Sequence, residues 1–160
     1  MVLRRLKKKK PPKVDEFEKF YNRTLRFLSY RPRSIKEITD FLKRKKVNPQ
    51  TTTKILNKLK ELNFVNDREF ARWWIEQRQG SRPRGWRLIK MELKQKGISC
   101  ELITNYQLPI TNEKELAKKA IEKIIVKYRQ LPREKAYQKL VQLLARRGFD
   151  WEVIKTVIDE

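Results

Sequence analysis

The sequence of 160 residues contains no histidine, a single cysteine (Cys100) and four glycines. The lack of histidine excludes a histidine metal site, a Ser-His-Asp triad and histidine general-base chemistry. One cysteine excludes a disulfide framework and a metal site built from cysteine ligands. Neither a Walker A nor a GxGxxG phosphate-binding pattern occurs. We therefore expect a protein that is not an enzyme and that needs no metal and no cofactor.

Long apolar runs are missing as well. No stretch of 18 or more apolar residues occurs, so we expect no membrane-spanning helix. The charges of residues 1–6 are not followed by an apolar segment, which argues against a secretory signal. Hydrophobic residues still make up 39% of the sequence, enough for a folded core. Together these features predict a folded cytoplasmic protein, and we expect a monomer.

Acidic residues are scarce relative to basic ones. Asp and Glu number 19 against 41 Lys and Arg, which gives a formal net charge of +22. A large anionic partner would relieve the resulting self-repulsion, and nucleic acid is the leading candidate. Residues 1–14 form a flexible basic arm in this interpretation. The arm acts either as a solubilising tail or as a nucleic-acid-binding segment.

From Asp15 onward, apolar residues recur at helical spacing and helix start signals are frequent. Ser34 and Glu37 form a capping-box pattern, and Asn48 is followed by a proline. Gly97 and Gly148 are placed as helix ends. The pattern predicts nine helices and no strand.

A period of 51 residues superposes the chain on itself. The aligned sets include Ile38, Ile89 and Leu140, then Leu42, Leu93 and Leu144, and also Ile35, Trp86 and Tyr137. This period predicts an all-α protein of three tandem three-helix repeats, forming an elongated, curved solenoid. We place the repeats at residues 15–65, 66–110 and 111–160. We expect the aligned apolar residues in the core, with base stacking as the alternative for Trp86.

The densest basic stretch lies between residues 78 and 97. Its loop 80–85 places arginines at the start of a helix, where the helix dipole and the planar guanidinium groups favour anions. The predicted main binding face consists of Arg78, Arg82, Arg84, Arg87, Lys90 and Lys94. Secondary basic contacts are predicted at Arg31, Arg33, Arg146 and Arg147. The last two have an alternative role in stabilising the end of their own helix.

Carboxylates show no arrangement that suggests catalysis. Asp67 and Glu69 fall in the first turn of a predicted helix, where acids are expected on dipole grounds. A metal-dependent nuclease needs clustered acids, and the sequence offers none. An enzyme is therefore the least favoured of the functions considered.

The order of the motifs resembles that of RecX regulatory proteins. Residues 66–71, then Arg78 and Gly85, then residues 88–98 are similar to the central signature of this family. Residues 139–149 are similar to its C-terminal signature, and residues 28–34 also fit. The resemblance covers residues 17–158. The chain departs from the family at Lys46, where glycine is frequent.

The resemblance implies a non-enzymatic modulator of the RecA recombinase in DNA repair, recombination and the SOS response. Such proteins are all-helical, lie in the groove of the RecA–DNA filament and inhibit its ATPase, growth and strand exchange. The implied partners are the RecA filament and the backbone of single-stranded or duplex DNA. The alternative, from charge alone, is a sequence-independent DNA- or RNA-binding protein without a recombinase partner.

Overall fold

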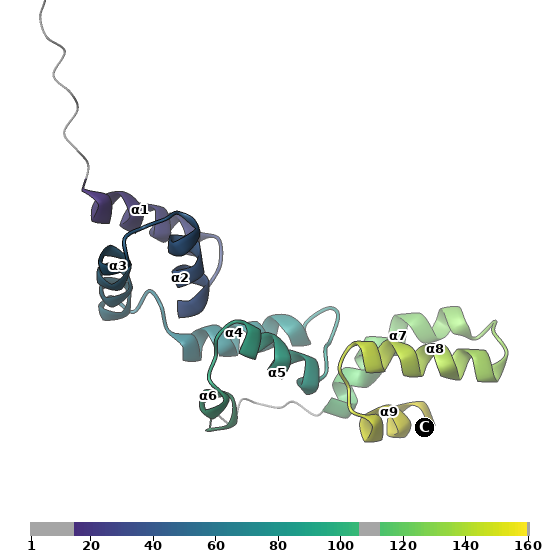
Figure 1. The fold of residues 1–160 in the computed structure, drawn as a ribbon. Coiled ribbons are helices and arrows are strands. Elements are labelled where there is room, and N and C mark those ends of the chain that lie inside the picture. Colours follow the sequence, from purple (N-terminus) through teal and green to yellow (C-terminus); the bar gives the residue numbers. More distant parts are fainter. Residues whose placement is uncertain (1–14, 106–112, 160) are drawn as a thin grey trace, which may run out of the picture.

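The computed structural model describes residues 15–105 and 113–159, and within these ranges the chain forms nine α-helices and no strand. The helices pack around three separate cores, and Figure 1 shows the resulting groups following one another along an elongated, bent body. The predicted all-α architecture of tandem three-helix units is confirmed. The helices are α1 (Glu16–Ser29), α2 (Ile35–Arg44), α3 (Pro49–Glu61), α4 (Asp67–Gln79), α5 (Trp86–Gln95), α6 (Cys100–Asn105), α7 (Glu113–Tyr128), α8 (Arg133–Arg146) and α9 (Trp151–Asp159).

Each group of three helices has its own hydrophobic core. Ile38, Leu42 and Ile55 are fully buried in the first repeat. Phe70 lies in the core of the second repeat and Phe149 in that of the third. The aligned leucines and isoleucines of the 51-residue period therefore lie in the cores, as their helical spacing predicts. Because the cores are separate, the contacts between neighbouring repeats determine how the repeats are positioned relative to one another.

Local signals account for most helix boundaries. The Ser34 hydroxyl accepts the Glu37 N–H and the Glu37 carboxylate accepts the Ser34 N–H, a complete capping box. Asn48 accepts from the N–H of Gln50 at 2.8 Å before the proline that begins α3. The middle helix of each repeat is followed by a residue of positive φ, namely Lys46, Gly97 and Gly148. These left-handed residues turn the chain from the middle helix into the third helix.

The first joint between repeats brings the start of α2 against the end of α5. The buried Ser34 hydroxyl donates a 2.7 Å hydrogen bond to the Lys96 carbonyl oxygen. The Ile35 N–H donates to the Asp67 carboxylate at 2.8 Å. An amide at the start of one middle helix is thus satisfied by an acid at the start of the next repeat.

The second joint repeats this arrangement one unit further along the chain. The Gly85 N–H donates to the Arg147 carbonyl oxygen at 2.9 Å. The Trp86 N–H donates to the carboxylate of Glu113, at the start of α7. The start of α5 therefore packs against the end of α8 as the start of α2 packs against the end of α5. Equivalent joints explain how similar repeats build a continuous body.

The period is broken in the third repeat. The first helical residues Ile35 and Trp86 are 51 positions apart, but α8 begins at Arg133, four residues before the position that this spacing predicts. Tyr137 therefore lies within α8 and is 37% exposed, so the prediction that it is a core residue is wrong. Within the described chain, no further repeat packs against this end of α8 to bury the ring. Trp86 does pack against the second core. Tyr106, also aligned by the period, lies outside the described residues.

Candidate functional site

The loop between α4 and α5 is held rigidly at both ends. The Arg84 N–H donates to the Arg78 carbonyl oxygen at 2.9 Å, and the Pro83 side chain is fully buried. Gly85 then contacts the third repeat, as described above. Arg82, between these fixed points, is exposed. The loop therefore presents one arginine to solvent on an ordered backbone at the joint of two repeats.

Two of the predicted binding arginines are engaged within the second repeat. The Glu92 carboxylate accepts from the Arg78 Nε at 2.7 Å and from the Trp74 indole N–H at 2.9 Å, and it also pairs with Arg84. The Arg78 guanidinium lies 4.1 Å from the centre of the Trp74 ring. The Glu92 side chain is only 13% exposed. Arg78 and Arg84 thus hold the loop in place, a role that the charge pattern alone did not indicate.

The second joint brings together basic residues that are far apart in the sequence. Arg82 and Arg84 of the second repeat lie near Arg146 and Arg147 of the third, because α5 begins where α8 ends. Burial lowers the pKa of Arg147, and the charges of the other three arginines lower it further. The Arg147 guanidinium also donates to the Ala120 carbonyl oxygen at 2.9 Å. Part of the main set and part of the secondary set predicted from the sequence therefore meet in one cluster, the joint arginine cluster.

The predicted basic stripe on α5 is divided by the structure. Arg87 is directed to the third repeat, where it contacts the Ala145 carbonyl oxygen at 3.4 Å and the Asp150 carboxylate at 4.0 Å. Lys90 is partly buried, and Lys94 is exposed. Arg87 therefore belongs with the joint arginine cluster, whereas Lys94 lies nearer the other end of the helix.

At the first joint, the secondary residue Arg31 forms a bidentate ion pair with Glu37, at 2.9 and 3.1 Å. Lys96 adds a 2.6 Å contact to the same carboxylate from the second repeat. Burial by itself raises the pKa of Glu37, but the hydrogen bonds from Arg31 and Lys96 outweigh it and lower the pKa to about 2. The other secondary residue, Arg33, stacks on Phe27 with its guanidinium 3.9 Å from the ring centre.

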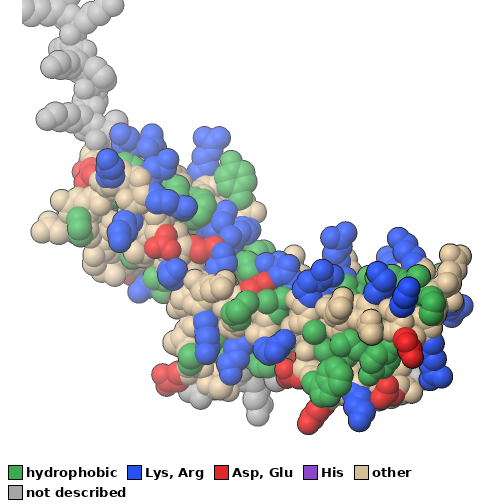
Figure 2. Space-filling view, turned by 45° about the vertical axis from the view of Figure 1, so that its right-hand side comes forward, with side chains coloured by type: hydrophobic (Ala, Val, Ile, Leu, Met, Phe, Trp, Pro, Cys, Tyr) green, Lys and Arg blue, Asp and Glu red, His purple; other side chains and the backbone are tan. Residues whose placement is uncertain are grey.

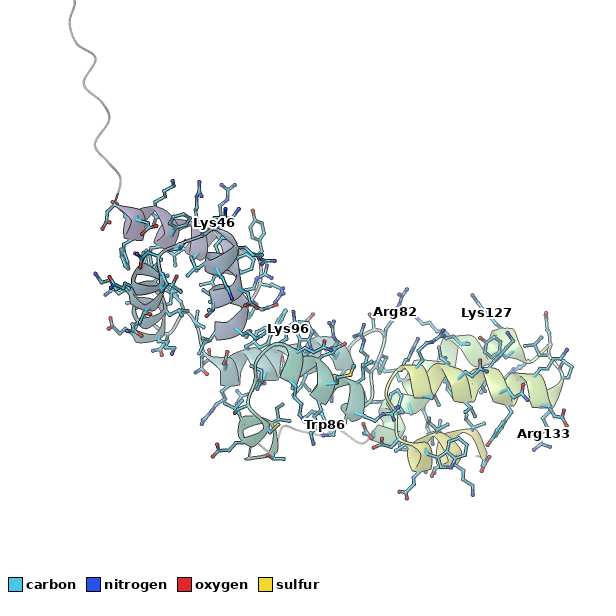
Figure 3. The ribbon with its side chains drawn as sticks, in the orientation of Figure 1. Lys46, Arg82, Trp86, Lys96, Lys127 and Arg133 are labelled. Atoms are coloured by element: carbon cyan, nitrogen blue, oxygen red, sulfur yellow. The ribbon has the colours of Figure 1, made fainter. Side chains whose placement is uncertain are left out.

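Many exposed basic side chains follow one edge of the molecule, and others are spread over the rest of the face in view. Figure 2 shows Lys and Arg side chains along the upper edge across all three repeats. In Figure 3, Arg82 and Lys127 point to the same side from the second and third repeats. Lys127 was not singled out from the sequence, because it lies in an apolar stretch of α7 without a cluster of neighbouring charges. The structure reveals it on the same side of the molecule as Arg82.

Metal ligands and membrane-spanning segments bear on the class of protein. In residues 15–105 and 113–159, no group of three or more Asp, Glu, His or Cys side chains is placed to hold a metal ion. No helix in the same ranges is long and apolar enough to cross a membrane. The fold and the site thus define a tandem three-helix-repeat protein with a basic cluster at a joint between repeats.

Comparison with known proteins places this class in a family. Three family models match in order: the first three-helix domain of RecX over residues 21–59, the second over 66–105 and the third over 112–158. The chain belongs to the RecX family.

Several relatives share this similarity. The regulatory protein RecX of Oceanobacillus iheyensis is 34% identical over 91% of this chain and 54% of its own length. That of Streptococcus gordonii is 36% identical over 84% and 52%. The chain therefore spans about half the length of the curated relatives it matches. The crystal structure of RecX from Lactobacillus salivarius has a TM-score of 0.76 and is 28% identical, covering 91% of this chain and 96% of that one.

Proposed function

We propose that this chain binds a RecA recombinase filament together with its DNA, and inhibits its ATPase, growth and strand exchange. The observation that carries the proposal is the joint arginine cluster, in which Arg82 of the second repeat and Arg146 of the third both lie near Arg147, where the backbones of the two repeats meet. Like charges held close together repel one another, and an anionic surface offsets that repulsion. Family membership supports the choice of RecA as the partner.

The elongated shape supports a filament as the target. Three repeats with equivalent joints present similar surfaces at regular intervals, and basic side chains follow one edge of all three (Figure 2). Such a body can contact successive subunits of a filament, so that individually weak contacts act together through a high effective concentration. The name of the relatives, regulatory protein, supports a regulator rather than an enzyme.

The test is a titration of this chain into RecA ATPase on single-stranded DNA, with DNA sites in slight excess. Strong inhibition while bare DNA remains means that the chain acts on the filament. Inhibition that requires enough protein to coat the DNA, and that extra DNA relieves, contradicts the proposal. That result favours the alternative, a sequence-independent nucleic-acid-binding protein, for which the charge of +22 is sufficient.

A paired variant tests the site. Arg82→Glu with Arg146→Glu reverses two exposed charges of the cluster, and we expect inhibition to be lost. Arg84 is left unchanged, because a glutamate there would face Glu92 and disturb the loop itself. Lys54→Glu with Lys155→Glu makes the same change in net charge on α3 and α9 and serves as the control. Equal loss in both variants would show that total charge matters and the cluster does not.

A further inference from the structure

A groove of about 730 Å³ lies between the first and second repeats, away from the joint arginine cluster. The end of α1 and the loop that follows it line one side, and residues from Phe64 to Trp73 line the other. Leu25 and Leu28 also line it. The volume falls within the range of ligand-binding sites.

Aromatic side chains line both sides of this groove. Tyr30 is 72% exposed and Phe64 is 54% exposed, although both are large rings in a protein with well-formed cores. Trp73 lines the groove beside them and packs at its inner edge against the second core. Exposed apolar rings gathered at one concave site mark a binding surface. The two exposed rings come from the first repeat and Trp73 from the second, so the complete groove exists only because the first joint places them together.

Arg33 supplies a positive charge at the same groove. Its guanidinium lies over the Phe27 ring, and its Nε is buried without a hydrogen-bond partner among the described residues. Arg31, its neighbour in the groove, is instead neutralised by the bidentate pair with Glu37. The charge of Glu37 also acts on Arg33, but among the described residues Arg33 forms no ion pair of its own. The groove therefore combines flat apolar faces with one guanidinium suited to a phosphate, and Glu69 adds one exposed carboxylate to its lining.

We infer that this groove binds unpaired nucleotides of a single-stranded nucleic acid, with bases stacked on Tyr30 and Phe64 and a phosphate at Arg33. This assignment rests on the proposed function, because it specifies where the chain would contact the DNA of the filament. Exposed rings beside a cationic group are the usual arrangement for binding single strands, since every base offers a flat face. A duplex hides those faces within its own stack, so the groove selects single strands.

The basic charge of the chain favours this occupant over a peptide. An apolar peptide would use the rings and leucines but would leave the charge of Arg33 unpaired, whereas a nucleotide satisfies both. Single-strand binding also suits the substrate on which the proposed partner assembles. A peptide occupant is one of the outcomes that the experiment can return.

The experiment compares Tyr30→Ala/Phe64→Ala with Trp151→Ala/Tyr137→Ala, which removes two exposed rings from the third repeat. Binding of a 5′-labelled oligothymidylate of about 20 nucleotides and of a duplex of the same length is measured by fluorescence anisotropy at several salt concentrations. Loss of two stacking contacts weakens single-strand binding at least tenfold, with duplex binding changed less than about twofold. The control variant binds both as the wild type does. The salt dependence stays the same for the double alanine variant and falls by about 0.7 in log–log slope for Arg33→Gln.

A second measurement uses the unaltered chain. An oligonucleotide carrying 5-iododeoxyuridine is photo-crosslinked, and the modified residues are mapped by mass spectrometry. Crosslinks at Tyr30, Phe64 or Trp73 support the assignment, and crosslinks found only outside the groove overturn it.

In the binding experiment, equal weakening of single-strand and duplex binding by the double alanine variant also overturns the assignment. If the double alanine variant keeps its affinity for single strands but no longer inhibits RecA, the groove holds a peptide. If the variant keeps both its affinity for single strands and its inhibition of RecA, the groove assignment fails and the proposed function stands.

Discussion

A Cβ atom added to Gly85 would lie 2.3 Å from the carbonyl oxygen of Gly148, so the backbones of the second and third repeats meet at these two glycines. The contact fixes the approach of α5 to the end of α8. Any side chain at Gly85 must push the two repeats apart, because the atoms opposite are backbone atoms that cannot move aside.

The first prediction follows from this contact. Gly85→Ala lowers the free energy of unfolding by about 2–3 kcal/mol, because the added methyl group overpacks a joint made of backbone. Gly80→Ala is the control, since a Cβ there meets no atom closer than 3.6 Å. Urea unfolding of the two variants measures the difference. An alanine at position 85 that leaves stability unchanged would mean that this joint is open in solution.

The second prediction concerns Glu92, which accepts from Trp74, Arg78 and Arg84 in a largely buried position. Glu92→Gln leaves two guanidinium groups facing each other without their counter-charge, and we expect a loss of about 2–4 kcal/mol. Glu76→Gln, on the exposed side of α4, changes stability by less than about 0.5 kcal/mol. Thermal unfolding followed by circular dichroism provides the comparison. Equal melting temperatures for both variants would contradict the structural role of this carboxylate.

The third prediction concerns the pH dependence of the first joint. The folded-state pKa of Glu37 is lowered from 4.5 to about 2, so its unfolded form binds protons more readily than its folded form. The stabilisation is therefore complete above pH 4.5 and disappears as the pH falls through about 2. We expect wild type to exceed Glu37→Gln by about 2 kcal/mol at pH 7 and to lose this advantage near pH 2.

This difference is measured by urea unfolding of both proteins across the pH range. Subtracting the variant removes the contribution of Asp67, whose pKa is shifted in the opposite direction because burial raises it. Asp40→Asn removes an exposed carboxylate from the same helix, serves as the control, and changes stability at pH 7 by less than about 0.5 kcal/mol. A gap that persists at pH 2 would contradict the lowered pKa of Glu37.

The fourth prediction uses the departure from the family pattern at Lys46. Its φ of 56° lies in the left-handed region, in the place where Gly97 and Gly148 follow the other two middle helices. Lys46→Gly removes the steric cost of that conformation and stabilises the protein by about 1 kcal/mol. Lys45→Gly, at a residue with φ of −83°, lowers stability by about 0.5–1 kcal/mol. Chemical denaturation measures the change in the free energy of unfolding for both variants. Changes of opposite sign at these adjacent lysines support the backbone argument, and changes of equal sign contradict it.

Local sequence signals were sufficient for most of the helices. The capping box at Ser34, the cap at Asn48 and the terminal glycines each act within a few residues of chain, so a single sequence contains the information that they need. The 51-residue period identified three similar units for the same reason, since each unit has its own core. Tyr137 was predicted wrongly because its burial depends on a neighbouring repeat and on the actual start of α8.

The candidate site was only partly predictable. Charge clustering selected Arg78, Arg82 and Arg84 together, but the structure separates them: two hold Glu92, and only Arg82 is exposed. The partner that distinguishes them, Glu92, lies eight or more residues away, and a count of charges treats all three arginines alike. Arg146 and Arg147 were placed in a secondary set, although they lie against the loop of the main set.

The sequence by itself determined the helices, the three-fold repeat and the excess of positive charge, because these depend on neighbouring residues or on composition. The tertiary structure decided which charges meet. Contacts of Ser34 with Lys96 and of Gly85 with Arg147, each about 60 residues apart, set the position of one repeat against the next. Those joints create both the joint arginine cluster and the aromatic groove, since each surface draws its residues from two repeats that touch only after folding.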